Sequence, residues 1–154
     1  MESVAQVAPD ESSPAPSLIY VVGRVNQGIT RELRALLREW DLSVQEYTSL
    51  SVLELRPGLS NAQLARRALV TPQSMLEILA KLERRGLVRR KIDPEHGRVI
   101  RNELSERGQR VLGIAAPEVD QLQERIFAGL SEAQRKAVTA ALSTAMSRLS
   151  RRGR

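Results

Sequence analysis

The 154-residue sequence contains no cysteine, and this absence excludes several kinds of chemistry. Without a thiol the chain has no disulfide, no thiolate nucleophile, no cysteine-ligated zinc and no thiol redox sensor. Aromatic residues are also scarce, at 3% of the chain, so a core must be built from leucine, valine, isoleucine and alanine. That composition suits packed helices better than a β-sandwich.

The residues of an active site are missing as well. The chain has one histidine, His96, no glycine-rich phosphate loop and no Ser-His-Asp pattern. His96 could ligate a metal together with Asp93 and Glu95, but three close neighbours on one turn give poor coordination geometry. We therefore expect no enzymatic activity, no catalytic residue, no metal site and no cofactor.

No apolar run approaches the roughly 20 residues that cross a bilayer. The first residues include Glu2, Asp10 and Glu11 in place of the basic and apolar stretches of a secretory signal, so a cytoplasmic location is expected. Positive charge is in excess: 24 Lys and Arg against 18 Asp and Glu give a net charge of +6. This favours nucleic acid as a partner, although an anionic membrane surface or a simple need for solubility would also explain it.

Helical periodicity dominates both ends of the chain. Residues 1–16, rich in proline, serine and acids, are expected to form a disordered N-terminal tail. Apolar residues then recur at helical spacing from Leu18 to Trp40, which predicts a long first helix. After Ser105 the same spacing predicts two more helices, the second opened by a capping box at residues 131–134.

The middle of the chain predicts two short helices followed by a β-hairpin. A capping box at residues 60–63 opens the first helix, and Thr71-Pro72 opens a second that ends at Gly86. Two β-like runs follow, Leu87 to Ile92 and Arg98 to Leu104, separated by a turn-rich tip. A helix pair followed by a basic hairpin is typical of a winged helix-turn-helix, which binds DNA.

Several polar and basic residues of this unit are candidates for DNA contact. The second helix of the pair turns a hydrogen-bonding face outward, suited to base edges in the major groove, and Arg98 near the hairpin tip could enter a minor groove or bind phosphates. The alternatives are an ordinary solvated helix face and a hairpin that is basic only to prevent edge pairing. The predicted DNA-binding residues are Ser60, Arg67, Gln73, Ser74, Glu77, Lys81, Arg98 and Arg101.

The chain resembles the MarR family of winged helix-turn-helix transcriptional regulators. The resemblance rests on Leu82-Glu83-Arg84-Arg85-Gly86-Leu87-Val88-Arg89-Arg90 at the helix exit, on Asp93-Pro94 and Arg98 in the wing, and on Leu104-Ser105-Glu106-Arg107-Gly108. Ser105 follows Arg98 by seven residues, as the family's threonine does. The sequence departs from the family at His96, which occupies the position where the family usually has an aspartate in the wing. Without that carboxylate, a neighbouring arginine would lack the group that orients it. Leu76-Glu77 replaces a frequent Thr-Arg pair.

The resemblance implies a mainly α fold with a small β-hairpin wing, in which a helical dimerisation layer flanks the winged helix-turn-helix. Residues 17–40 and 106–150 would form the dimerisation region, and residues 41–105 the DNA-binding domain. The apolar stripes of the terminal helices support a homodimer independently, because a chain this short offers them no other partner.

The resemblance also implies a transcriptional regulator, most often a repressor, that binds double-stranded DNA and is released by a small aromatic acid. Tyr20, Arg24, Trp40 and Tyr47 are the candidate ligand residues, with core packing as the alternative for each aromatic side chain. A different function remains open: a protein-interaction module that keeps the winged fold without binding specific DNA.

Overall fold

The computed structural model describes residues 15–152, and the side chains of residues 15–149. The elements in chain order are α1 (Leu18–Leu37), the short 3-10 helix η1 (Arg38–Trp40), α2 (Val44–Leu55), β1 (Leu59–Ser60), α3 (Asn61–Ala68), α4 (Pro72–Arg84), β2 (Val88–Ile92), β3 (Ile100–Leu104), α5 (Glu106–Ile126) and α6 (Glu132–Arg152). About 70% of the described residues are helical, and the described part also contains one small antiparallel sheet, which confirms the predicted fold class. The expected tail, residues 1–16, lies outside the described residues except for its last two.

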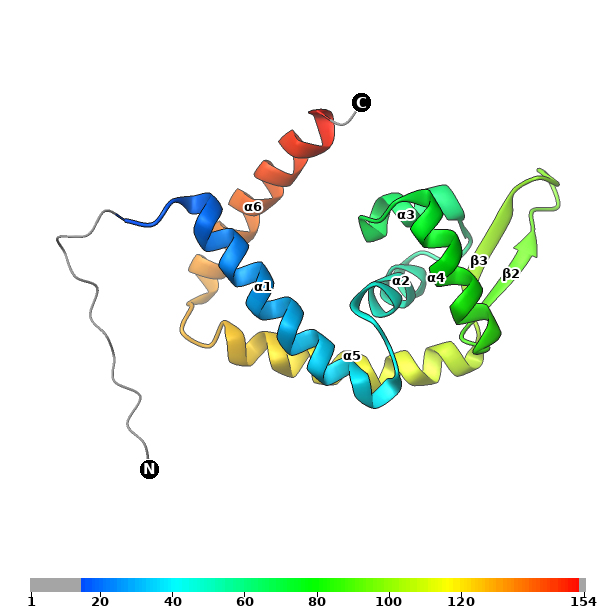
Figure 1. Ribbon diagram of the computed structural model, residues 1–154, viewed down its shortest axis with the longest axis horizontal. Helices are drawn as coiled ribbons and strands as arrows, with labels where there is room; N and C mark the ends of the chain where they lie inside the picture. The colour runs from blue at the N-terminus through cyan, green and yellow to red at the C-terminus, as the bar shows by residue number, and fades with distance from the viewer. Residues whose placement is uncertain (1–14, 153–154) are drawn as a thin grey trace.

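The helices and the sheet form two parts joined by α5 (Figure 1). Helices α2, α3 and α4 lie on one side with the β2–β3 hairpin beyond them, whereas α1 and α6 lie on the other side. Helix α5 begins at the foot of the hairpin and runs under both parts. A change in the position of α1 relative to the hairpin must therefore involve α5 or the α1–α2 junction, since these connect the two parts.

The helix starts agree with the capping residues in the sequence. Ser60 accepts a hydrogen bond from the Gln63 backbone and Thr71 accepts one from the Ser74 backbone, so both caps satisfy amides that the first turn leaves free. After α4, Gly86 adopts the left-handed conformation with φ of 68°, as predicted for a glycine that ends a helix. The helix pair of the predicted DNA-binding unit is therefore confirmed.

The sheet differs from the prediction in two places. A third strand, β1, pairs with β3 through Leu59–Asn102 and Ser60–Arg101. It has only two residues, the second of which is also the cap of α3, so it gives no strand signal in the sequence. Strand β3 begins at Ile100 and not at Arg98, because a tight turn precedes it in which the Asp93 amide donates to the Val99 carbonyl. Arg98 consequently lies in the turn itself.

The main core lies under the helix-turn-helix and is built mostly from leucine, as the scarcity of aromatic residues requires. Its most deeply buried members are Leu37, Leu50, Leu53, Leu64, Met75, Leu79, Leu82, Leu87 and Leu112. The apolar stripe of α6 does not join this core. The helical spacing of Val138, Leu142 and Leu149 predicts that they face inward, yet they are exposed, Leu149 by 73%, because no other element in the described part of the chain covers that stripe. None of the helices in the described part could cross a membrane.

Candidate DNA-binding surface

Small side chains allow α3 and α4 to cross closely. Ala65 and Ala68 of α3 are buried at the crossing. The turn between the helices contains Leu69 in the left-handed conformation (φ 56°), and its side chain is 75% exposed. Leu69 therefore does not fix the two helices together, and of the two apolar residues in this turn only Val70 packs against the core.

Helix α4 has one buried face and one exposed face. Met75, Leu79 and Leu82 anchor it in the core, so Gln73, Ser74 and Glu77 are exposed as predicted. Ser74 serves partly as a structural residue, since its hydroxyl accepts a hydrogen bond from the Thr71 hydroxyl at 2.8 Å. The exposed face also includes Leu76, which the sequence analysis did not select as a contact residue.

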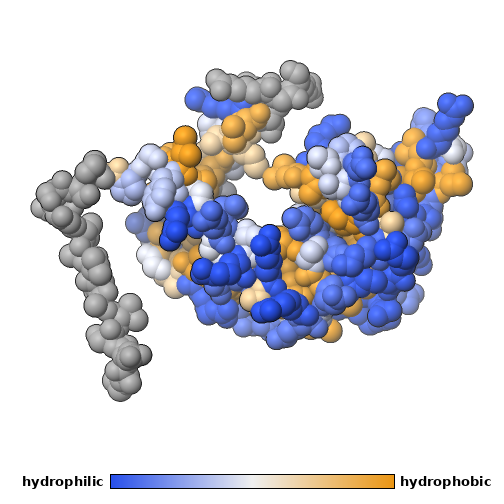
Figure 2. All heavy atoms as spheres, viewed as in Figure 1, coloured by the Kyte–Doolittle hydropathy of each residue, from blue (hydrophilic) through white to orange (hydrophobic). Residues whose placement is uncertain are grey.

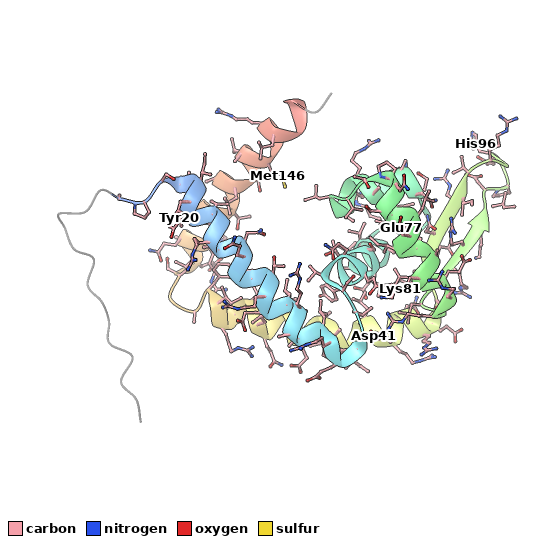
Figure 3. The ribbon with its side chains drawn as sticks, in the orientation of Figure 1. Tyr20, Asp41, Glu77, Lys81, His96 and Met146 are labelled. Atoms are coloured by element: carbon pink, nitrogen blue, oxygen red, sulfur yellow. The ribbon has the colours of Figure 1, made fainter. Side chains whose placement is uncertain are left out.

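A buried carboxylate ties the second half of α4 to the start of α2. Glu46 completes the capping box of α2 by accepting a hydrogen bond from the Ser43 amide at 2.8 Å. The Lys81 Nζ lies 2.9 Å from Glu46 Oε1, and Arg85 Nη1 lies 3.8 Å from Glu46 Oε2. Lys81 is thus held by a partner within the protein, and its predicted contact with the DNA backbone has to compete with this ion pair. Figure 3 labels Lys81 one turn beyond Glu77 on α4.

Arg85 extends the same connection to the α1–α2 junction. Its guanidinium donates to the Asp41 carbonyl at 2.6 Å and to the Trp40 carbonyl at 2.9 Å. These two carbonyls end the 3-10 helix that joins α1 to α2. Helix α4 is consequently fixed to the segment that connects the DNA-binding unit with the terminal helices.

Asp93 organises the wing. Its carboxylate accepts hydrogen bonds from Arg101, with Nη2 at 2.6 Å and Nε at 2.8 Å, and from the amides of Glu95 and His96. The Arg101 guanidinium and these amides hold the pKa of the Asp93 carboxyl below its usual value. The expectation that the wing lacks an orienting carboxylate is therefore wrong: Asp93 supplies it from three residues before His96, which lies at the wing tip (Figure 3).

The hairpin cations divide into paired and unpaired groups. Arg90 pairs with Glu83 at 3.4 Å, Lys91 pairs with Glu103 at 3.2 Å, and Arg101 also donates to the Gly58 carbonyl. Arg101 therefore has a structural role, and its contact with DNA stays a prediction. In contrast, Arg89 and Arg98 are exposed and make no ion pair with any residue between 15 and 149.

Helix α3 adds two more unpaired cations. Arg67, a predicted contact residue, is exposed, and so is its neighbour Arg66, which the sequence analysis did not select. Neither pairs with an acid in the described part of the chain. Ser60 uses its hydroxyl as the cap of α3. Free positive charge of this unit thus lies on α3 and the wing, on either side of the exposed face of α4, and at the end of α4, where Arg84 is exposed and has no acidic partner among the described residues.

The four candidate ligand residues do not form one site. Tyr20 and Asp41, the neighbour of Trp40, lie at opposite ends of α1 (Figure 3). The 20 residues between Tyr20 and Trp40 correspond to about 30 Å of helix. Trp40 and Tyr47 are half-buried and pack against the main core, and burial raises the pKa of the Tyr47 hydroxyl. Within one chain the helix keeps Tyr20 apart from Trp40 and Tyr47, so the four residues do not meet there, and their role in binding a ligand stays a prediction.

A polar cavity of about 680 Å³ does lie at the α1–α2 junction. Arg31 and Arg34 of α1 and Arg38 at the start of η1 line it on one side, and the cap and first turn of α2 line it on the other with Ser43, Val44 and Gln45. Arg34 and Arg38 have no acidic partner within the described residues. Three arginines beside a helix N-terminus make this cavity suitable for an anion.

Comparisons with known proteins agree with this geometry. A family model described as "MarR family" matches residues 40–99. The HTH-type transcriptional repressor Rv2887 of Mycobacterium tuberculosis is 36% identical over 126 residues, which are 82% of this chain and 88% of that protein. Among solved structures, Rv2887 in complex with salicylic acid has 34% identity and a TM-score of 0.67, and the match covers 84% of this chain and 96% of that one.

A second solved structure supports the fold. The transcriptional repressor CouR, bound to a 23-mer DNA duplex, has a TM-score of 0.78 at 22% identity, with 84% of this chain and 92% of that chain covered. The extent of the match to Rv2887, together with the winged helix-turn-helix geometry, establishes the relationship. The chain belongs to the MarR family of transcriptional regulators.

Proposed function

We propose that this DNA-binding transcriptional regulator acts as a homodimeric repressor whose affinity for its operator is lowered by a small aromatic acid. The observation that carries the proposal is the exposed face of α4 between the unpaired arginines of α3 and the wing. Base edges would be read by α4, and phosphates would be bound by Arg66, Arg67 and Arg98. Such a protein works in the cytoplasm and needs no catalytic residue.

Binding to duplex DNA should depend strongly on salt. If each dimer neutralises about six to ten phosphates, the logarithm of the affinity should fall with the logarithm of salt concentration at a slope of about −5 to −9. Arg98→Ala should cost about 1–3 kcal/mol of binding free energy, because Arg98 is an unpaired cation at the wing tip. Fluorescence anisotropy with labelled duplex from the region upstream of the protein's own gene measures both quantities.

Arg125→Ala is the matched control for the wing, since Arg125 is an exposed, unpaired arginine in the last turn of α5. It removes the same charge about 30 Å along the helix from the foot of the wing and should leave affinity nearly unchanged. Salt-independent binding would favour the protein-interaction module. Equal affinities for wild type and Arg98→Ala would show that the wing tip does not contact DNA.

A second copy of the chain is the proposed occupant of an apolar groove between α1, α5 and α6. The groove encloses about 620 Å³ and is lined by Val22, Val25, Phe127, Val138 and Leu142, among others. Hydrophobic atoms gather over α6 and the start of α1 (Figure 2). Exposed apolar surface on two adjacent helices is typical of an interface, and a pair of chains would cover both stripes at once.

Leu142→Glu should convert the dimer to a monomer, because the new carboxylate would lose its water in the closed groove. Light scattering after size exclusion measures the change in mass. The control Leu55→Glu places the same charge at an 81% exposed leucine on α2, outside the groove, and should stay dimeric. A monomeric wild type, or a dimeric Leu142→Glu variant, would exclude this interface.

The cavity at the α1–α2 junction is the proposed effector site. A carboxylate would pair with Arg31, Arg34 or Arg38, and the ring would lie against Leu42 and Val44. The relative Rv2887 has been solved with salicylic acid, which has this chemistry. Release of DNA requires that the ligand bind the DNA-free form more tightly than the DNA-bound form.

Salicylate should change the fluorescence of Trp40, the single tryptophan, and release DNA over the same concentration range. Arg34→Ala should weaken both effects about tenfold or more, since it removes a charged partner from the cavity. Arg24→Ala is the matched control, because Arg24 is on the same helix but does not line the cavity. If salicylate changes neither signal at millimolar concentration, or if Arg24→Ala matters as much as Arg34→Ala, the proposed effector site is wrong.

A further inference from the structure

An exposed leucine and an exposed glutamate occupy adjacent positions on the outward face of α4. Gln73, Leu76, Glu77 and Ala80 follow the i, i+3, i+4, i+7 spacing of one helix face. Leu76 is 49% exposed, although the other large apolar residues of α4 are buried or half-buried. Leu76 therefore adds little to the core, and its position on the face that would enter a major groove requires another explanation.

The same face lacks a free cation over its first turns. Lys81 is paired with Glu46, and Arg85 is directed to the α1–α2 junction. Glu77 has no hydrogen bond or ion pair with any residue from 15 to 149. The unpaired arginines of α3 and the wing would bring DNA to the surface, and the Glu77 carboxylate would then face the base edges without a compensating charge.

A carboxylate in the major groove accepts hydrogen bonds and donates none. Guanine presents two acceptors there and would repel it, and adenine presents an acceptor next to its amino group. Cytosine presents the amino donor without an adjacent acceptor, so it is the base edge that Glu77 fits best. The thymine C5-methyl group is the apolar feature of the same groove, and it is the natural contact for Leu76.

We propose that Leu76 and Glu77 determine operator specificity by reading pyrimidines: Leu76 contacts a thymine methyl group and Glu77 accepts a hydrogen bond from a cytosine amino group in each half-site. The proposal rests on the DNA-binding function proposed above and adds the base identities to it. Affinity then comes mainly from arginines outside α4, and α4 contributes discrimination.

The Leu76 contact is tested by removing single methyl groups from the DNA. Full-length protein first selects its preferred sequences from a pool of duplexes with 20 randomised base pairs. Each thymine of a selected duplex is then replaced by deoxyuridine, which removes only the C5-methyl group. At one thymine per half-site the wild type should lose about fourfold in affinity, a value typical of one buried methyl group. Leu76→Ala should be insensitive to this replacement.

Leu69→Ala is the matched control, because Leu69 is an exposed leucine in the turn before α4 and not on its outward face. This variant should keep the sensitivity of the wild type. If deoxyuridine has no effect at any position, or if Leu76→Ala keeps the effect, Leu76 does not read thymine.

Glu77→Gln tests the cytosine contact in the same selection. A glutamine side chain suits the adjacent donor and acceptor of adenine, so the preferred base should change from cytosine to adenine at one position per half-site. Affinity for unrelated duplexes should rise, because one repulsion of phosphate is removed. Glu132→Gln makes the same change of charge at the start of α6 and should leave the selected sequence unaltered.

Failure of the DNA-binding function and failure of the base contacts would give different results in this selection. A pool from which the wild type enriches no sequence would overturn the proposed function and this inference with it. Enrichment of one sequence that stays the same in Glu77→Gln would overturn the inference alone and leave the DNA-binding function standing.

Discussion

Glu46→Ala is expected to lower the free energy of unfolding by about 2–4 kcal/mol, measured by urea denaturation. Glu46 is 2% exposed and interacts with three groups: the Ser43 amide, Lys81 and Arg85. Alanine would remove a capping interaction and leave the largely buried Arg85 guanidinium with only the exposed carboxylate of Asp41, 3.7 Å away, as an acidic partner. The loss should remain below that of a fully buried pair, because Lys81 is half exposed and can be solvated by water.

The variant should also weaken DNA binding, since Glu46 fixes the angle of α4 relative to the α1–α2 junction. Glu46→Gln keeps an acceptor for the Ser43 amide and should recover part of the stability but not the ion pairs. Glu54→Ala, at an exposed and unpaired position on the same helix, should stay within about 0.5 kcal/mol of wild type. An equally stable Glu46→Ala protein would mean that the two cations are adequately solvated without it.

The helix-turn-helix could be predicted from the sequence because its signals are local. Ser60 with Gln63, and Thr71 with Pro72, determine helix starts within four residues, and Gly86 determines the exit of α4. Each signal depends on backbone groups of the adjacent turn, so no knowledge of the tertiary structure is needed.

The parts that were missed join residues distant in the sequence. Glu46 meets Lys81 and Arg85 across at least 35 positions, and β1 exists only because β3 comes back beside it. The Asp93–Arg101 pair spans the hairpin and depends on the register that places the turn at residues 93–99. Sequence alone showed these residues as free charges, and their pairing changes which cations remain available for DNA.

The candidate ligand residues fail to converge within one chain for a related reason. Tyr20 and Trp40 have the aromatic chemistry that suits the wall of a ligand pocket, but most of α1 lies between them. In contrast, the arginines at positions 31, 34 and 38 recur at helical spacing, and this spacing in the sequence indicates that they share one side of α1 and the η1 that continues it.

Gly108→Ala is expected to lower the free energy of unfolding by about 3 kcal/mol, the upper part of the range for overpacking a buried site. A Cβ atom at Gly108 would lie 2.0 Å from the Leu87 carbonyl oxygen and 3.0 Å from its carbonyl carbon. That oxygen accepts a hydrogen bond from the Ser105 amide at 3.0 Å, and the Ser105 hydroxyl donates to the Gly86 carbonyl. The exit of α4 and the start of α5 are thereby in direct backbone contact, so neither can move away without breaking these bonds.

The contact between the α4 exit and the start of α5 explains why serine and glycine occupy positions 105 and 108. Ser105 caps α5 and donates to the Gly86 carbonyl, and Gly108 allows the two backbones to touch. Gly113→Ala is the matched control in the same helix, because its Cβ would meet no atom within 4 Å. Replacing this exposed helical glycine should raise stability by about 0.5–1 kcal/mol. Thermal and urea denaturation of the two variants should therefore shift in opposite directions. If both variants are stabilised, α5 does not pack directly against Leu87, and the wing is not held to the recognition helix by this contact.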